Sequence, residues 1–275
     1  MKLLIGGVLL EVQERGAGDL SLVFLHYWGG THRTWNKVTA ELQSSYRTVT
    51  YDMRGWGESG ASRNGYSISV LADEAMALIE HLALSRYILI GHSMGGKVAQ
   101  LVASRNPPGL LGLVLVAPAT PTPTFLPEEA KQQQIHAYDN RETVLQTIAF
   151  LSEGALDPDT VEQVVRDSLS GTPEAKRAWP ATAMLEDISS ELSKIAVPTL
   201  VLAGEQDRLD SVEQHRREVV ARIAEATLEV IPQSGHLLPL DEPERTACAI
   251  QHFVDHVRSG STSSGNDVNS GGAQR

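Results

Sequence analysis

The chain has 275 residues, of which 41% are hydrophobic and 21% charged, and its formal net charge is −11. These proportions are ordinary for a soluble globular protein, and the length suits either two average domains or one large α/β domain with an insertion. The acidic balance, without a Lys/Arg run or a basic helix face, argues against nucleic acid as a partner.

The N-terminal stretch MKLLIGGVLLEVQERG places a lysine before apolar residues. Gly6 and Gly7 divide the apolar run, Glu11 ends it, and no small-residue cleavage site follows. We therefore expect two short strands around a Gly-Gly turn rather than a signal peptide. Because no apolar run approaches the roughly 18 residues that a membrane span needs, we expect a cytoplasmic protein without a membrane partner.

Short apolar runs then alternate with stretches of helical periodicity. Runs rich in Val, Leu and Ile predict buried strands over residues 20–26, 46–52, 86–91, 110–118, 197–204 and 226–232. Helical patterns occupy residues 34–42, 69–82, 94–104, 211–224 and 242–257. Because the strand runs lack strict alternation, they suit a mostly parallel sheet with helices on both faces. The pattern predicts an α/β fold with right-handed crossovers.

Residues 118–190 break this alternation. They show helical periodicity between Pro-, Thr- and Gly-rich breaks but no strand pattern, and RETVLQTIAF and DTVEQVVRDSL each place apolar residues on one face. We predict a helical cap inserted between core strands, so that residues 1–117 and 191–258 form the core domain. The apolar faces should cover the carboxyl edge of the sheet, or else pack against a second copy of the chain in a homo-oligomer.

Near the C-terminus, the single cysteine, Cys248, lies in a helical pattern, and we interpret it as a small core residue. One cysteine excludes an intrachain disulfide and is compatible with a reducing compartment. Residues 259–275 are rich in Ser and Gly, with almost no apolar residues, and are predicted to be disordered.

The stretch YILIGHSMGGKVAQ, residues 87–100, fits two chemical motifs. G-x-x-x-x-G-K is most of a phosphate-binding loop, whereas G-x-S-x-G is the turn that carries a nucleophilic serine. A phosphate loop needs Ser or Thr directly after its lysine to bind magnesium, and Val98 stands there. Asp52 is the only acidic strand end that could complete such a site. The sequence therefore favours the serine motif, with Ser93 as nucleophile and Gly91 and Gly95 allowing strand and helix to pack closely.

A serine nucleophile needs a histidine to take its proton and an acid to hold that histidine's tautomer. After the strand PTLVLAG comes EQDRLD, in which Asp207 stands where loop residues meet the crevice at the sheet's carboxyl edge. Glu205 and Asp210 are its rivals. After the last strand comes QSGHLLPLDEP, and of the nine histidines only His236 follows both partners on a loop at that edge.

The other histidines receive structural interpretations. His26 should brace the loop after its strand, and His92 should point away from the nucleophile beside it. His32 and His136 have no placed partner. The histidines within helical patterns are interpreted as surface or packing residues: His81, His215, His252 and His256.

The oxyanion of an acyl-transfer reaction needs two preorganised N–H donors. One is expected from the backbone of Met94, after the nucleophile, and the other from Trp28 in the loop YWGG. A pocket roofed by the cap should be apolar and of limited volume. Its predicted lining residues are Tyr27, Trp28, Trp179, Met184 and Leu237.

Five motifs stand in order along the chain: HYWGG (26–30), DMRGWGES (52–59), GHSMGG (91–96), GEQD (204–207) and SGHLLPLDEP (234–243). With this set the chain, from residue 3 to residue 258, resembles the α/β-hydrolase fold enzymes. D-x-R-G-x-G-x-S is similar to the subgroup of capped esterases, lactonases, cofactor-free haloperoxidases and C–C bond hydrolases. The resemblance implies their mostly parallel sheet, helical cap and Ser–His–Asp triad. One departure is Tyr27, where the family often has glycine.

The serine nucleophile argues against haloalkane dehalogenase and epoxide hydrolase chemistry, which in related folds use aspartate there. The predicted function is hydrolysis of a small or medium, uncharged carboxylic ester through an acyl-enzyme, with no cofactor and no metal. A lactonase, which opens a cyclic ester with the same residues, is the main alternative. Perhydrolysis of the haloperoxidase type, C–C hydrolysis and, from another class, a small-ligand receptor with weak turnover also stay open.

Overall fold

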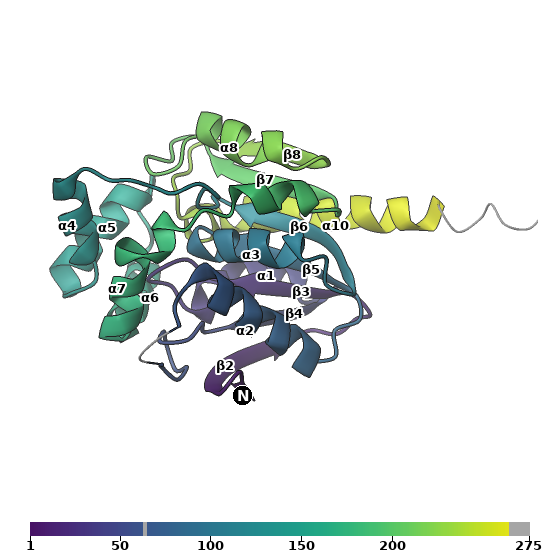
Figure 1. The fold of residues 1–275 in the computed structure, drawn as a ribbon, viewed down its shortest axis with the longest axis horizontal. Coiled ribbons are helices and arrows are strands. Elements are labelled where there is room, and N and C mark those ends of the chain that lie inside the picture. Colours follow the sequence, from purple (N-terminus) through teal and green to yellow (C-terminus); the bar gives the residue numbers. More distant parts are fainter. Residues whose placement is uncertain (63–64, 264–275) are drawn as a thin grey trace, which may run out of the picture.

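An eight-stranded, mostly parallel sheet forms the centre of the computed structural model, which describes residues 1–62 and 65–263 (Figure 1). Its strands are β1 (Lys2–Ile5), β2 (Val8–Arg15), β3 (Ser21–Leu25), β4 (Arg47–Tyr51), β5 (Tyr87–His92), β6 (Leu110–Val116), β7 (Thr199–Gly204) and β8 (Ala226–Ile231). They lie in the order β1-β2-β4-β3-β5-β6-β7-β8. β1 and β2 pair antiparallel around the expected Gly-Gly turn, β2 pairs antiparallel with β4, and the later pairs are parallel.

Each central strand sends alternate side chains into two hydrophobic clusters, one on each face of the sheet. In β3, Leu22 and Phe24 join the cluster beneath α1 (Asn36–Leu42) and α10 (Pro243–Ser263). Val23 and Leu25 join the opposite cluster, where α2 (Ile68–His81) packs against α3 (Met94–Ser104). Because both faces are buried, the strands read as continuous apolar runs. The predicted α/β fold is confirmed.

The remaining core helices are short. α8 (Val212–Glu218) follows β7, and α9 (Leu238–Asp241) precedes α10. Among the described residues there are also four 3₁₀ turns, in the core and in the segment between β6 and β7: η1 (His32–Trp35), η2 (Ala183–Leu185), η3 (Ser189–Lys194) and η4 (Val220–Arg222). The single helix predicted over residues 211–224 is therefore wrong in detail, because Val219 leaves the regular helical conformation, at φ −115° and ψ −63°.

An all-helical insert, residues 117–198, separates β6 from β7. It contains α4 (Glu128–Ile135), α5 (Arg141–Leu151), α6 (Pro158–Ser170) and α7 (Pro173–Ala181), which lie together at the left of Figure 1, beyond one end of the sheet. The helix starts follow local chemistry, since Asn140, Asp157 and Thr172 cap the first turns of α5, α6 and α7 with their side chains. Pro158 and Pro173 then occupy first helical positions, where the missing N–H costs nothing.

The two ends of the insert run side by side. The amide of Thr124 donates to the carbonyl of Met184 over 3.0 Å, and that of Ile188 donates to Pro121 over 2.9 Å. Past this neck, η3 packs against α3 of the core. The chain thus enters and leaves the insert at neighbouring places.

Two expectations near the C-terminus are wrong. Cys248 is exposed rather than buried, because α10 turns Ala247, Ile250 and Val254 toward the sheet and leaves the position after Ala247 facing outward. α10 also runs to Ser263 and so includes the start of the predicted disordered tail. Its backbone continues with regular geometry, and the Ser259 hydroxyl donates to the Asp255 carbonyl over 2.9 Å. The rest of that tail, residues 264–275, lies outside the described residues.

Within the described residues, the structure contains no helix that combines the length and the apolar character of a membrane-crossing segment.

Candidate active site

Ser93 stands at a strained turn between β5 and α3. Its backbone has φ 52° and ψ −115°, a left-handed conformation that a residue with a side chain rarely adopts. A Cβ on Gly91 would lie 2.4 Å from the carbonyl oxygen of Gly95, and a Cβ on Gly95 would lie 2.6 Å from that of Leu25. Only glycine at both positions lets α3 come this close to β5 and β3. The turn has the form of a nucleophile elbow.

The three residues predicted for the triad come together at the carboxyl edge of the sheet. Nε2 of His236 lies 2.8 Å from Oγ of Ser93, and Nδ1 of the same ring lies 2.8 Å from Oδ2 of Asp207. The other carboxylate oxygen of Asp207 accepts from the amides of Leu209 and Asp210, over 2.8 and 3.1 Å. All three side chains are buried. The loop amides thus fix the carboxylate while one oxygen stays available for the imidazole.

The electrostatics of this pair favour a charged acid and a basic histidine. Burial raises the pKa of Asp207, but the charge of His236 and its hydrogen bond outweigh burial and bring that pKa below its usual 3.8. Burial likewise lowers the pKa of His236, but the carboxylates of Asp207, Asp210 and Asp241 together outweigh burial, with Asp207 contributing most, so that the pKa lies above the usual 6.5. The arrangement holds a proton on Nδ1 and leaves Nε2 to accept one from the serine hydroxyl.

The two rival acids are placed differently. Asp210 is buried, and its carboxylate accepts from Nε2 of Gln214 over 3.3 Å. Burial raises the pKa of Asp210 to about 7. Glu205 is exposed and accepts from the amide of Gln233 over 3.2 Å. Across the described part of the chain, neither carboxylate is hydrogen-bonded to His236.

His92 turns out to support the neighbouring histidine. Its Nε2 donates to the carbonyl oxygen of His236 over 2.8 Å, and the two ring centroids lie 5.4 Å apart. Burial lowers the pKa of His92 to about 3, which keeps the ring neutral. Sequence reasoning placed its side chain away from the serine but missed this contact. A polar residue ending an otherwise apolar strand was the available signal.

The loop YWGG, residues 27–30, follows β3 and is called the oxyanion loop below. The carbonyl of Tyr27 accepts from the amide of Gly30 over 3.0 Å and lies 2.7 Å from Nδ1 of His26. Nε2 of His26 accepts from the amide of Met53 over 2.9 Å, so the ring must be protonated on Nδ1 and donates to Tyr27. His26 thus braces the loop as expected and fixes the peptide whose N–H belongs to Trp28.

Two backbone N–H groups near the serine are free to donate. Met94 is the first residue of α3, where an amide has no partner within its helix. Among the hydrogen bonds of the described residues, neither the Met94 amide nor the Trp28 amide is a donor. Both predicted oxyanion donors are therefore available to a ligand.

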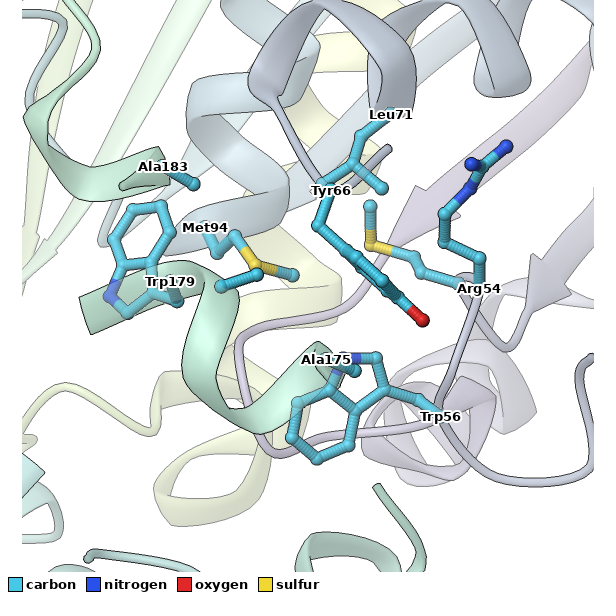
Figure 2. A pocket seen from close by; sticks show the side chains of 10 residues that line it. Arg54, Trp56, Tyr66, Leu71, Met94, Ala175, Trp179 and Ala183 are labelled. Carbon is cyan, nitrogen blue, oxygen red and sulfur yellow. The ribbon is translucent and has the colours of Figure 1, made fainter. Parts of the chain in front are cut away.

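An apolar pocket lies between Met94 and the insert (Figure 2). It holds about 250 Å³ of space, including its open mouth. Figure 2 shows Trp179 of α7 beside Met94 and Ala175 of the same helix beside Trp56, while the guanidinium of Arg54 points away from them. The full lining is Met53, Arg54, Trp56, Tyr66, Leu71, Met94, Ala175, Ala178, Trp179 and Ala183.

The other residues predicted to line the pocket lie elsewhere. Tyr27 and Leu237 lie instead in a closely packed apolar region with residues of α5 and α6. The indole of Trp28 packs on Tyr138, with ring centroids 4.3 Å apart. Met184 is buried at the neck of the insert. Of the predicted set, Trp179 alone lines the pocket at Met94.

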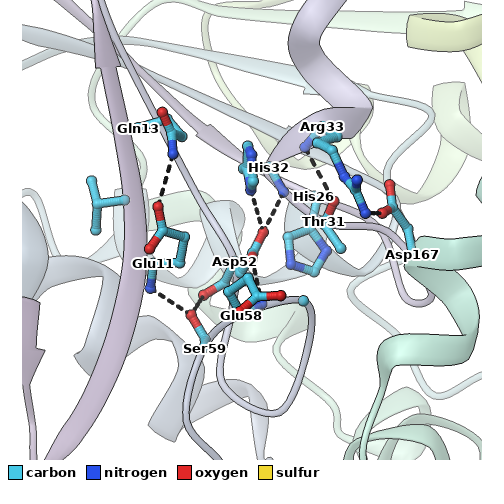
Figure 3. A network of polar contacts seen from close by, with 12 residues as sticks. Glu11, Gln13, His26, Thr31, His32, Arg33, Asp52, Glu58, Ser59 and Asp167 are labelled. Atoms are coloured by element: carbon cyan, nitrogen blue, oxygen red, sulfur yellow. Dashed lines mark hydrogen bonds and ion pairs between the residues drawn. The ribbon is translucent and has the colours of Figure 1, made fainter. Parts of the chain in front are cut away.

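Asp52 has a structural role rather than the magnesium-binding role of the phosphate-loop alternative. Its Oδ1 accepts from the amide and from Nδ1 of His32, each over 2.7 Å, and its Oδ2 accepts from the amide of Glu58 over 2.9 Å (Figure 3). These bonds join the chain after β3 to the turn after β4. The network continues through an ion pair between Arg33 and Asp167 of α6, which attaches the insert to the core.

This fold and this arrangement of side chains are those of an α/β hydrolase. Residues 22–249 match the alpha/beta hydrolase family, and the chain belongs to that family. It is 27% identical over 259 residues to 3-oxoadipate enol-lactonase 2 of Acinetobacter baylyi, across 91% of this chain and 93% of that protein.

Solved structures of esterases share the whole fold. An esterase from Exiguobacterium antarcticum superposes with a TM-score of 0.84 at 23% identity, over 94% of this chain and 98% of that one. A thermophilic esterase from Thermogutta terrifontis superposes with a TM-score of 0.81 at 27% identity, over 94% and 98% of the two chains. The expected family is confirmed, and the chain is similar to both esterases and a lactonase.

Proposed function

We propose that the chain is a serine hydrolase that cleaves small or medium, uncharged carboxylic esters through an acyl-enzyme. The observation that carries the proposal is the unbroken series of contacts from Ser93 through His236 to Asp207, with 2.8 Å on either side of the imidazole. The position of Ser93 at a strained strand-to-helix turn also supports its role as the nucleophile.

In the proposed reaction, Nε2 of His236 removes the hydroxyl proton as Ser93 Oγ attacks the ester carbonyl. The negative charge that develops on the carbonyl oxygen is met by the N–H groups of Trp28 and Met94. The imidazolium, stabilised by Asp207, then donates its proton to the leaving alcohol oxygen. Water then attacks the acyl-enzyme through the same proton transfers, and the carboxylic acid and the free serine are released.

The apolar pocket supports an uncharged acyl group. Its one charged side chain, Arg54, donates to Glu74 over 2.8 Å and to the carbonyl of Gly65 over 2.9 Å. The guanidinium is therefore already neutralised and does not offer a charge to a substrate carboxylate. We further propose that the insert acts as a cap, because Ala175 and Trp179 of α7 line the pocket together with Met94 of the core.

A lactonase is the second candidate, favoured by the similarity to an enol-lactonase. The same residues would open a cyclic ester, and the acyl-enzyme would then keep the alcohol group attached. A panel of acyl esters and lactones, each followed by product identification, separates the two functions. Hydrogen peroxide in the same panel tests for peracid formation. Ligand-dependent thermal stabilisation without multiple turnovers would instead indicate a receptor.

Replacement of Ser93 by alanine tests the proposal directly. We expect Ser93→Ala to lower kcat by a factor on the order of 10⁶ and to abolish labelling by a fluorophosphonate, because no other group can form the acyl-enzyme. The melting temperature should stay close to that of the wild type. A variant that kept a tenth of the wild-type rate would rule the mechanism out.

A further inference from the structure

The backbone carbonyls of the oxyanion loop are held from two sides. The carbonyl of Tyr27 is bonded within the core, as described above. The next two accept from the insert: the Tyr138 hydroxyl donates to the Trp28 carbonyl over 2.7 Å, and the Ser168 hydroxyl donates to the Gly29 carbonyl over 2.9 Å. Tyr138 lies between α4 and α5, and Ser168 lies in α6. Three successive peptide groups are thus fixed, two of them by the insert.

These contacts are closely fitted and buried. Tyr138 is 2% exposed and Ser168 is 0% exposed, so water cannot readily replace either hydroxyl. Gly29 has φ 97°, and a Cβ there would lie 2.3 Å from Cζ of Tyr138. Lys176 of α7 contacts both partners of the hydrogen bond between Tyr138 and Trp28. Its carbonyl accepts from Nε1 of Trp28 over 3.1 Å, and its ammonium donates to the Tyr138 carbonyl over 2.8 Å.

We propose that Tyr138 and Ser168 are positioning residues that hold the Trp28 N–H in the direction needed to stabilise the oxyanion. The inference rests on the proposed function. The core fixes the peptide before Trp28, and Tyr138 fixes the peptide after it, so that the residue cannot rotate between them. An oxyanion donor lowers the barrier only when it is oriented before the reaction begins. The insert therefore contributes to the rate as well as to the shape of the pocket.

The insert is also bonded to the loop that carries His236, residues 232–237, called the histidine loop here. The carbonyl of Leu151, the last residue of α5, accepts from the amide of His236 over 2.7 Å. Gly235 allows this approach, because a Cβ there would lie 2.5 Å from the Leu151 oxygen. Seating of the insert thus aligns the proton acceptor and the oxyanion donor together.

Tyr138→Phe tests the inference, because it removes one hydroxyl and keeps the ring. We expect kcat for p-nitrophenyl acetate to fall about tenfold, less than the roughly 10²–10³-fold cost of losing an oxyanion donor altogether, with little change in KM. Rates are expressed per site titrated with a fluorophosphonate. Tyr46→Phe is the matched control, since Tyr46 is also buried and its hydroxyl donates to Asp255 on α10, over 3.3 Å. The control should keep the wild-type kcat.

A thiono ester separates positioning from a general loss of structure. Its C=S sulfur accepts hydrogen bonds weakly, so its hydrolysis gains little from oriented N–H donors. Tyr138→Phe should therefore slow the oxygen ester about tenfold and the thiono ester less than about twofold. Equal slowing of the two substrates would overturn the inference and indicate a structural role.

Ser168→Ala provides a second variant, with Ser104→Ala as its control, because the buried Ser104 hydroxyl also donates to a carbonyl, that of Leu101, over 2.8 Å. We expect a smaller fall in kcat for Ser168→Ala, about threefold, since its contact lies one peptide further from Trp28. Wild-type kcat in both Tyr138→Phe and Ser168→Ala would overturn this inference alone. Activity that survives Ser93→Ala would overturn the proposed function, and this inference with it.

Discussion

Asp207 and Asp210 are both buried on one loop, yet only Asp207 touches the histidine. Asp207→Asn should keep the geometry but lose the charge that holds the tautomer, and kcat should fall by a factor on the order of 10⁴. Asp210→Asn is the matched control and should change kcat less than about threefold, because Asp210 bonds to Gln214 instead. Steady-state rates of the two variants show which aspartate acts on the histidine. The reverse order of effects would assign the acid to Asp210.

The pH profile depends on the pKa of His236, which must be neutral to accept the serine proton. Since Asp207 holds that pKa above 6.5, the inactive, protonated form persists to a higher pH than for a free histidine. We expect kcat/KM to rise with pH through a midpoint above 6.5. The midpoint should move to lower pH in Asp207→Asn, where the stabilising charge is gone. A profile that falls across this range would contradict His236 as the base.

The three side chains of the proposed triad could be predicted from the sequence because each follows a strand that is itself recognisable. Supporting residues gave weaker signals. For His215 the sequence left a surface and a packing position open, and its side chain is wholly buried, because the sequence of α8 does not mark its inward face. Tyr138 lies in a turn of the insert, 110 positions from the carbonyl that it holds. Contacts of this kind depend on how the insert is seated, which no local pattern encodes.

The insert and the core are connected by an ion pair whose strength should depend on pH. Burial raises the pKa of Asp167 to about 6, although the Arg33 guanidinium acts against it. Because this carboxyl ionises at higher pH in the folded chain than in the unfolded one, its contribution to stability falls as the pH rises from about 4 to 6. Without Arg33 the folded pKa should rise further, and the loss should extend to higher pH.

Arg33→Gln should therefore lower the free energy of unfolding at pH 8 and have little effect at pH 5, where Asp167 is largely protonated in the folded state. We expect a loss of roughly 1–2 kcal/mol, below the 3–5 typical of a fully buried pair, because Arg33 is partly exposed. Denaturant unfolding at the two pH values measures the difference. Adding Asp167→Asn should restore stability at pH 8, and equal losses at both pH values would contradict the account.

At the level of elements, the sheet was more predictable than the insert. A strand buried on both faces is apolar throughout, whereas α5 and α6 have only part of their surface covered by the rest of the chain. RETVLQTIAF predicted one apolar face that includes Leu145, yet Val144 and Ile148 are buried while Leu145 is 37% exposed. Helical periodicity identifies a helix but does not determine how wide a stripe its neighbours will cover.

The arrangement of the whole molecule should limit the substrates of the proposed hydrolase. The insert lies beyond one end of the sheet (Figure 1), and it is held over the site by hydrogen bonds to the oxyanion loop and to the histidine loop. With both loops tied to it, the insert cannot swing away without disturbing the catalytic groups. The insert should therefore stay in place beside the pocket during turnover, unlike a lid that opens at a lipid surface.

The apolar pocket between Met94 and Trp179 is small, and we expect it to accommodate a short acyl chain and to exclude a long one. We expect p-nitrophenyl acetate and butyrate to be cleaved much faster than the palmitate, as measured by kcat/KM, with no jump in rate when a substrate exceeds its solubility. Trp179→Ala should shift the preference toward longer chains, because the indole limits the depth of the pocket. A wild-type preference for palmitate, or a jump in rate at its solubility limit, would mean that the insert opens as a lipase lid does.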